Sequence, residues 1–257
     1  MKTLFSLVIM VATMLSVSAC RIEKNSVNTE RKSYNVSVGA FNRITAAGAF
    51  DVHFIQGSSY KVKLKTAPEL RDHIEVFTKD GTLVVRWKKK QRKGVTVLQF
   101  GDHSSDIELW VTAPDINTVA IAGSCDFTAE NNLNLDRLDI AVAGSAEVSL
   151  REVVCRDNFG FQVAGSGDLE VARLKASKAD MSISGSGSVE ATLDHVNNTN
   201  MQISGSGDAE LKFIDCYEAS ASISGSGSLG AKGSLRKFHR SVRGSGSIDD
   251  HQLTIRN

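Results

Sequence analysis

The chain has 257 residues, and its 30 Lys and Arg balance 29 Asp and Glu, so the formal net charge at pH 7 is +1. This balance, without a recognisable reader motif, argues against a nucleic-acid partner. The length is sufficient for one β domain with a single core after an N-terminal signal is removed.

The N-terminus has the pattern of a lipoprotein signal peptide. An apolar run, residues 4–17, is followed by Ser18, Ala19 and Cys20. The run is too short for a membrane span, and small residues directly before a cysteine resemble a bacterial lipobox, although valine replaces the usual leucine. We therefore predict a lipoprotein signal in residues 1–20 and lipid attachment at Cys20. An ordinary signal peptide with an incidental cysteine is the alternative.

A polar segment without periodicity follows, residues 21–33, and we predict that it is a flexible tether. The predicted protein is therefore exported and anchored to a membrane of the cell envelope, which we expect to be the outer membrane. No acidic run follows Cys20, so the sequence leaves open whether the domain faces the periplasm or the cell surface.

Irregularly spaced strands are predicted in residues 34–119. Residues 68–71 interrupt the strands and are compatible with one helical turn. Asp80-Gly81 lies between two β-rich runs, which is a hairpin signal. The expected strands are residues 35–39, 48–55, 60–65, 74–77, 83–87 and 107–112. Residues 48–55 look like a worn copy of the glycine unit that repeats in residues 120–257.

One dense basic run follows the hairpin, and it is a candidate anion-binding site for lipid head groups or a phosphorylated glycan. The alternative is a solvated hairpin end that blocks edge pairing. Its residues are Lys88, Lys89, Lys90, Arg92 and Lys93.

Residues 120–257 consist of seven copies of one glycine-serine unit. The first glycines of successive copies are 21, 21, 20, 20, 20 and 19 residues apart, and a regular spacing near twenty predicts a solenoid in which each repeat stacks on its neighbours. These glycines are Gly123, Gly144, Gly165, Gly185, Gly205, Gly225 and Gly244.

Aligning the copies on this glycine places isoleucine or valine two residues before it and mostly apolar residues four and six residues after it. Even offsets indicate strands with one buried face. Small residues occupy the glycine position and, in most copies, the position two residues later. We expect a tight bend or inner wall there, where a side chain would collide with the facing strand. A phosphate-binding loop is disfavoured because no helical period follows any copy.

Polar side chains occupy the outward offsets, and strands stacked about 4.8 Å apart would align them into ladders on one outer face. This outer face is a candidate surface for binding a ligand. The alternatives are a solvated face, a calcium site and the carboxylates of a polysaccharide-cleaving β-helix. Calcium-binding repeats recur about every nine residues, so we predict no metal and no cofactor. The candidate binding face comprises Asp126, Glu147, Asp168, Glu170, Glu190, Asp208 and Glu210.

Three cysteines remain after Cys20. Cys155 and Cys216 share one offset but lie three rungs apart, about 14 Å, which exceeds the roughly 7 Å that a disulfide tolerates. Cys125 has another offset, so we predict three buried thiols without a bridge. The histidines share no offset, and the repeat places no histidine beside a serine, so we predict no enzymatic activity.

Three groups of residues carry a resemblance to a known family. They are FNRI at 41–44 followed by GAFDV at 48–52, LWVTAP at 109–114, and the repeated glycine-serine units. Their order resembles the GIN domain, an autotransporter-adhesin head, over residues 34–257. The resemblance implies a right-handed parallel β-helix in exported, often lipid-anchored envelope proteins of Gram-negative bacteria, and it implies no catalytic residue. Cys125, Ala146 and Arg243 depart from the repeat, where we expect the stack to end or change its cross-section.

The sequence therefore predicts a non-enzymatic adhesion, binding or structural module of the cell envelope, whose ligand is a glycan or a protein. The rival hypothesis is a polysaccharide-acting enzyme that uses Asp168, Glu170, Asp208 and Glu210. Such an enzyme needs a groove flanked by long loops, for which turns of about twenty residues leave little room.

Overall fold

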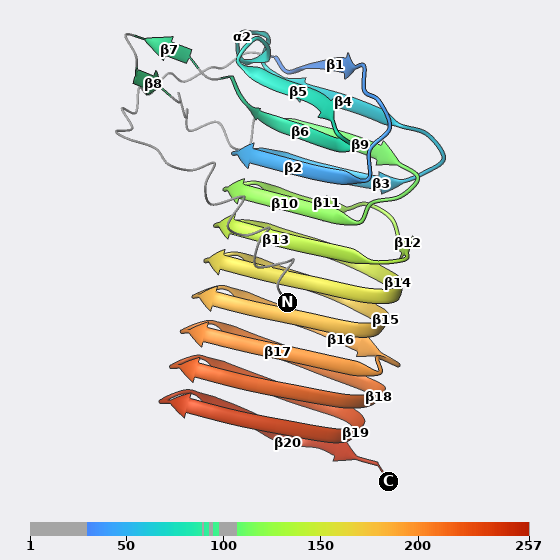
Figure 1. Ribbon diagram of the computed structural model, residues 1–257, viewed down its shortest axis with the longest axis vertical. Helices are drawn as coiled ribbons and strands as arrows, with labels where there is room; N and C mark the ends of the chain where they lie inside the picture. Colours follow the sequence, from blue (N-terminus) through green and yellow to red (C-terminus); the bar gives the residue numbers. More distant parts are fainter. Residues whose placement is uncertain (1–29, 89, 93–94, 98–106, 257) are drawn as a thin grey trace.

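Each repeat forms one turn of a parallel β-helix in the computed structural model, which describes residues 30–88, 90–92, 95–97 and 107–256 (Figure 1). Residues at the same offset lie beside one another in successive turns. Ile183 pairs with Ile203, and Ile203 pairs with Ile223. The expected solenoid, with its aliphatic columns in register, is confirmed.

Three rows of strand segments run along this stack, and we name two of them the neutral row and the acidic row. The third row is short and includes residues 133–135 and 153–155. The neutral row contains the strands that end at the repeat glycine, and the acidic row contains the strands that begin three residues later. Several strands bend through a corner and contribute their first half to the acidic row and their second half to the neutral row. The strands of the regular part are β10 (Thr118–Gly123), β11 (Asp126–Ala129), β12 (Leu133–Leu135), β13 (Leu138–Gly144), β14 (Glu147–Gly165), β15 (Asp168–Gly185), β16 (Ser188–Asp194), β17 (Asn198–Gly205), β18 (Asp208–Gly225), β19 (Ser228–Gly244) and β20 (Ser247–Ile255).

The N-terminal part adds a turn to the same stack and then closes its end. Gly48 pairs with Gly123, so β2 and β3 form a turn in register with the repeats, as the worn glycine unit predicts. β6 and β9 stack in parallel on the other side of that turn, and β4, β1 and β5 add antiparallel edges. These elements are β1 (Lys32–Val36), β2 (Arg43–Gly48), β3 (Asp51–Gln56), β4 (Lys61–Thr66), α2 (Pro68–Arg71), β5 (Ile74–Lys79), β6 (Thr82–Trp87), β7 (Lys90–Arg92), β8 (Val95–Val97) and β9 (Glu108–Ala113).

The predicted hairpin is confirmed, because β5 and β6 are antiparallel and Asp80 and Gly81 between them have φ angles of 49° and 71°. Two successive residues in this left-handed region match the tight turn that an Asp-Gly pair favours. The predicted helical turn is α2. Within the described residues, no helix has the length and hydropathy of a membrane span.

The inner wall differs from the expectation in one respect. At Gly185, φ is +138°, and an added Cβ would lie 2.1 Å from the carbonyl oxygen of Gly165 in the neighbouring turn. The collision is therefore with the backbone of the stacked strand, whereas the sequence suggested the facing strand. Glycine is required because the corner needs a positive φ and because successive corners touch.

The departures from the repeat lie at the ends of the regular stack. Cys125 and Ala146 are buried, and Phe50 is the buried residue at the equivalent position of the β2/β3 turn. Because these side chains are larger than the glycine of the later turns, the core is wider at its N-terminal end. Arg243 lies in the last turn, beside Ser224. The core side chains thus change at the N-terminal departures, and the described stack ends in the turn that contains Arg243.

The three cysteines are free thiols, and all are buried as expected. Burial raises the pKa of Cys125 and of Cys155 to about 12, and it also raises the pKa of Cys216. Thiols with such pKa values are poor nucleophiles, so these residues serve as core side chains.

Candidate functional site

The seven acidic residues chosen from the sequence lie on the outer side of the acidic row. Asp126, Glu147, Asp168 and Asp208 each begin the first strand of a turn, and all are exposed. Glu170 pairs with Glu190, and Glu190 pairs with Glu210, so these three form a second column. Asp51 of β3 extends the first column, because it pairs with Asp126.

The first column holds successive turns together. Asp168 Oδ1 accepts hydrogen bonds from the backbone N–H of Ser188 at 2.8 Å and from its hydroxyl at 2.7 Å. Asp208 does the same with Ser228, at 3.2 Å and 2.5 Å. Each of these bonds satisfies a backbone donor of the next turn. Serine alternates with aspartate only from Asp168 onward, because the preceding positions of the column are all carboxylates. Asp168 and Asp208 therefore have a structural role.

The second column is free for a ligand. Glu170, Glu190 and Glu210 make no hydrogen bond or ion pair with another described residue. At its C-terminal end the column reaches a hollow of about 330 Å³ above Gly230, between Glu210 and Asp249. Among the described residues, no group of three or more histidine, cysteine or carboxylate side chains could hold a metal ion.

A second candidate surface, which sequence reasoning missed, lies at the N-terminal end of the same outer face. It is a groove of about 740 Å³ across β1, β4 and β9, which we call the lysine groove. Lys61, Lys63 and Lys65 occupy alternate positions of β4 and point outward. The lining residues are Ser33, Asn35, Val36, Ile55, Tyr60, Lys61, Val62, Lys63, Lys65, Trp110 and Thr112.

Glu108 is the acceptor that organises this groove. Its carboxylate accepts hydrogen bonds from Lys65 Nζ at 2.9 Å and 3.1 Å and from Trp110 Nε1 at 3.2 Å, and Arg31 Nη1 lies 2.8 Å away. Burial alone would raise the pKa of Glu108, but Lys65, Trp110 and Arg31 together hold it below its usual value. The carboxylate is therefore charged at neutral pH and fixes the edge of the indole.

Trp110 is held on one face as well as at its edge. Its ring stacks on the His53 ring, with centroids 4.2 Å apart and an interplanar angle of 11°. His53 Nδ1 lies 2.6 Å from Glu130 Oε1, so the imidazole is itself anchored. Since β9 lies between β3 and β4, the other face of the indole is turned toward β4 and the groove. The groove thus presents a fixed aromatic surface.

A signal for this groove exists in the sequence but is incomplete. The sequence shows lysine at every second position of β4, and it shows a tryptophan in the alternating run that becomes β9. Their adjacency depends on the antiparallel pairing of β4 with β9, across an insertion of more than forty residues, which periodicity does not reveal.

The basic run does not form a described site. Lys88 is exposed, and its Nζ lies 3.4 Å from the carbonyl oxygen of Asp72. Lys90 and Arg92 belong to β7, which pairs with β8 in a hairpin. Lys89 and Lys93 lie outside the described residues, as does Cys20.

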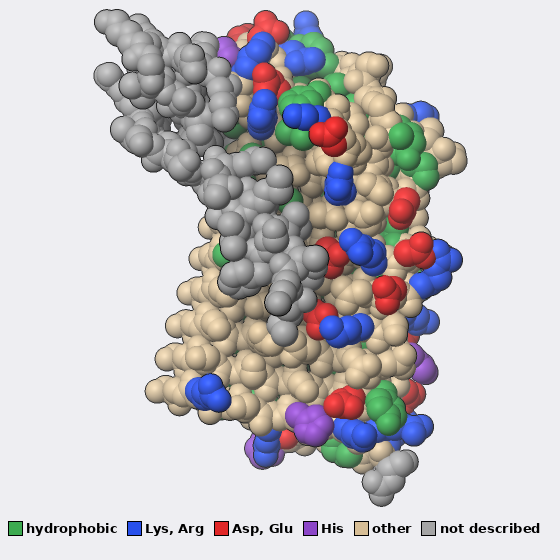
Figure 2. All heavy atoms as spheres, in the orientation of Figure 1, with side chains coloured by type: hydrophobic (Ala, Val, Ile, Leu, Met, Phe, Trp, Pro, Cys, Tyr) green, Lys and Arg blue, Asp and Glu red, His purple; other side chains and the backbone are tan. Residues whose placement is uncertain are grey.

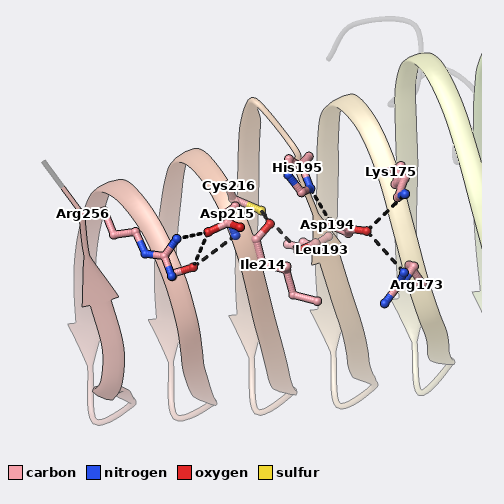
Figure 3. Close-up of polar contacts among 10 residues, drawn as sticks. Arg173, Lys175, Leu193, Asp194, His195, Ile214, Asp215, Cys216 and Arg256 are labelled. Atoms are coloured by element: carbon pink, nitrogen blue, oxygen red, sulfur yellow. Dashed lines mark hydrogen bonds and ion pairs between the residues drawn. The ribbon is translucent and has the colours of Figure 1, made fainter.

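Charged side chains also gather along one corner of the stack, over the right half of the face in Figure 2, whereas the lower left is mostly uncharged. Asp194 is 5% exposed, and it lies 2.5 Å from His195 Nδ1, 3.4 Å from Lys175 Nζ and 3.6 Å from Arg173 Nη1 (Figure 3). Burial alone would raise the pKa of Asp194, but the hydrogen bonds from His195 and Lys175 lower it overall.

The charged corner around Asp194 braces the stack. The Cys216 thiol donates to the carbonyl oxygen of Leu193 at 3.3 Å, inside the core, and its interaction with His195 is with the backbone of that residue. In the next turn, Asp215 Oδ1 accepts hydrogen bonds from the Ser234 hydroxyl and from Arg256 Nη1 (Figure 3). Among the described residues, three histidine rings pair with carboxylates, and no histidine ring is hydrogen-bonded to a serine, threonine or cysteine side chain.

A family model described as "Putative auto-transporter adhesin, head GIN domain" matches residues 40–213 and 194–257. No curated protein matches the chain.

Several crystal structures share the fold. A "putative adhesin" from Bacteroides fragilis NCTC 9343 is 24% identical, with a TM-score of 0.74, and the match covers 88% of this chain and 99% of that one. A "putative lipid binding protein" from Parabacteroides distasonis ATCC 8503 is 18% identical, with a TM-score of 0.66 and coverage of 88% and 99%. A "putative adhesin" from Parabacteroides merdae ATCC 43184 is 20% identical, with a TM-score of 0.64 and coverage of 88% and 98%.

Proposed function

Because the chain belongs to the family described as "Putative auto-transporter adhesin, head GIN domain", we propose that it is a non-enzymatic binding module of the bacterial cell envelope. The signal pattern before Cys20 supports export and lipid anchoring at that cysteine. The segment predicted as the tether, residues 21–33, then connects the anchor to the β-helix, and its last residues, Lys32 and Ser33, already belong to β1. The β-helix is the part that meets the ligand.

The observation that carries this proposal is the outer face of the acidic row. Along it, unpartnered glutamates and the lysine groove lie on one regular surface formed by β4, β9, β3 and the turns that follow. A repeat that presents the same kind of group in every turn spreads weak contacts over a long surface, which suits an extended ligand such as a glycan or an envelope protein.

The rival function, a polysaccharide-cleaving enzyme, has less support. Two of its carboxylates, Asp168 and Asp208, are occupied by Ser188 and Ser228. In the regular part, only two residues separate the glycine-ending strands from the next strand, as between Gly144 and Glu147, so no loop flanks the acidic columns there. The hollow between Glu210 and Asp249 is the place where the rival enzyme is tested, because two carboxylates line it.

Incubation of the purified full chain with acidic and neutral glycans tests the proposal. Retention of a glycan without new reducing ends is the expected result. New reducing ends that disappear in the Glu210→Gln/Asp249→Asn variant would establish the rival enzyme. Mass spectrometry of the Cys20→Ser variant and the unchanged chain tests the anchor, since only the unchanged chain should carry a lipid. Protease treatment of intact cells then decides between the cell surface and the periplasm.

A further inference from the structure

We propose that the lysine groove binds an anionic polysaccharide, with a sugar ring packed on Trp110 and the acidic groups of neighbouring sugars paired with Lys61 and Lys63. This inference rests on the proposed binding function and names the class of its ligand. It places the first contact at the end of the outer face where β1 follows the tether.

The unpaired positive charges of the groove favour an anionic ligand. Lys61 and Lys63 are exposed and make no ion pair with another described residue, whereas Lys65 is paired with Glu108. Alternate residues of a strand are about 6.6 Å apart along it, so the ammonium groups recur at a fixed interval. A polymer that carries one carboxylate or phosphate on each repeating unit matches such a row better than a single small anion.

The aromatic side chains suit sugar rings. Trp110 is fixed at its edge by Glu108 and on one face by His53, so little conformational freedom is lost when a ring packs on its remaining face. Tyr60 is 39% exposed in the groove, and its ring packs on Phe41 at a centroid distance of 5.3 Å. Ser33, Asn35 and Thr112 add neutral groups that can bond to sugar hydroxyls.

The neighbouring acidic residues favour a polymer over an anionic bilayer. Asp51 and Asp126 continue the outer face directly beyond Glu108. A flat anionic membrane laid on this face would meet these carboxylates together with the lysines, and like charges repel. A polysaccharide confined to the groove meets Lys61 and Lys63 without reaching Asp51 or Asp126, which do not line the groove. The charge pattern therefore selects a narrow ligand.

Isothermal titration of the purified full chain in detergent with an oligomer of galacturonic acid tests this inference, with an oligomer of galactose as the neutral probe. We expect binding of the acidic oligomer only, weakening as salt is added. The Lys61→Gln/Lys63→Gln variant should bind at least about tenfold more weakly, because two charge-assisted contacts are lost. The control, Lys178→Gln/Lys237→Gln, removes two exposed lysine charges outside the groove, and its affinity should stay within about twofold of the unchanged chain.

Three outcomes would overturn the inference. Equal binding by the lysine variant, with an unchanged circular dichroism spectrum, would place the glycan elsewhere and leave the proposed function standing. Lysine-dependent binding to phosphatidylglycerol vesicles without binding to the oligomer would assign the groove to a lipid surface. Failure of the unchanged chain to retain any glycan or envelope protein would refute the proposed function together with the inference. A Trp110→Phe variant that loses affinity while remaining folded would support the stacking contact.

Discussion

Arg240 of β19 donates a hydrogen bond from Nη1 to Asp250 Oδ1 of β20 at 2.5 Å, at the C-terminal end of the β-helix. Arg240 pairs with Ala221, and Ala221 with Met201, so the arginine occupies the end of a buried column. Val242 in the same strand is 41% exposed, because no described turn lies beyond it. The ion pair thus places charges at an open end where apolar columns stop, a common protection against edge-to-edge association.

Replacing this pair with leucine should cause self-association. In the Arg240→Leu/Asp250→Leu variant, the exposed end becomes apolar while its strand edges remain free, so copies can stack end to end. Sedimentation velocity over a range of concentrations should show dimers or larger species. The matched control is Arg156→Leu/Asp136→Leu, which removes an exposed pair from the side of the stack. Equal association of both variants would contradict a specific role for the end.

Gly185→Ala should strongly destabilise the fold. The positive φ of +138° and the 2.1 Å approach to the Gly165 carbonyl oxygen together should cost about 3 kcal/mol or more of unfolding free energy. Urea unfolding measures this cost. Gly39→Ala is the control, because its added Cβ would meet nothing closer than 3.9 Å, and it should change stability by less than about 0.5 kcal/mol. Similar losses for both would show that the corners are not strained.

The two acidic columns should respond differently to mutation. Asp168→Ala removes two hydrogen bonds to Ser188 and should lower the free energy of unfolding by about 1 to 2 kcal/mol. Glu190→Ala removes an exposed carboxylate between two like charges, so stability should stay the same or rise slightly. Unfolding of both variants in urea at pH 7 gives the comparison. A larger loss for Glu190→Ala would reverse the assignment of roles.

Asp194 should make the fold sensitive to acid. Its folded-state pKa is lowered, so the carboxylate stabilises the fold at pH values above its unfolded pKa, about 3.9, and this contribution is lost as the pH falls through the lower folded value. Asp194→Asn should therefore cost about 1 to 2 kcal/mol at pH 7 and progressively less below about pH 4. Urea unfolding at several pH values measures the difference. A constant difference down to pH 2 would contradict the assigned cause.

Much of the fold follows from the sequence because the repeat is local and regular. The β-branched column two residues before each glycine fixes the register, and the worn copy at Gly48 is correctly assigned to the same stack. The order in which the first turns stack does not follow from the sequence. β6 and β9 stack above β2 and β3, although they follow them in the chain, and this pairing depends on contacts between distant segments.

The candidate site was predicted in part. Exposed offsets place Glu170 and Glu190 on one face, since a strand alternates its side chains. The sequence does not distinguish these glutamates from Asp168, whose structural role depends on a serine in the next turn. Asp194 was likewise missed, because its cationic partners Arg173 and Lys175 come from the preceding turn.

Hydrogen exchange of the full chain, with and without a glycan that it retains, tests the binding role of the outer face most directly. The account predicts that protection increases in β1, β4 and β9, around Lys63 and Trp110, and that the neutral row is unchanged. Protection confined to the neutral row, at β10 and β13, or to the corner at Asp194 would contradict it.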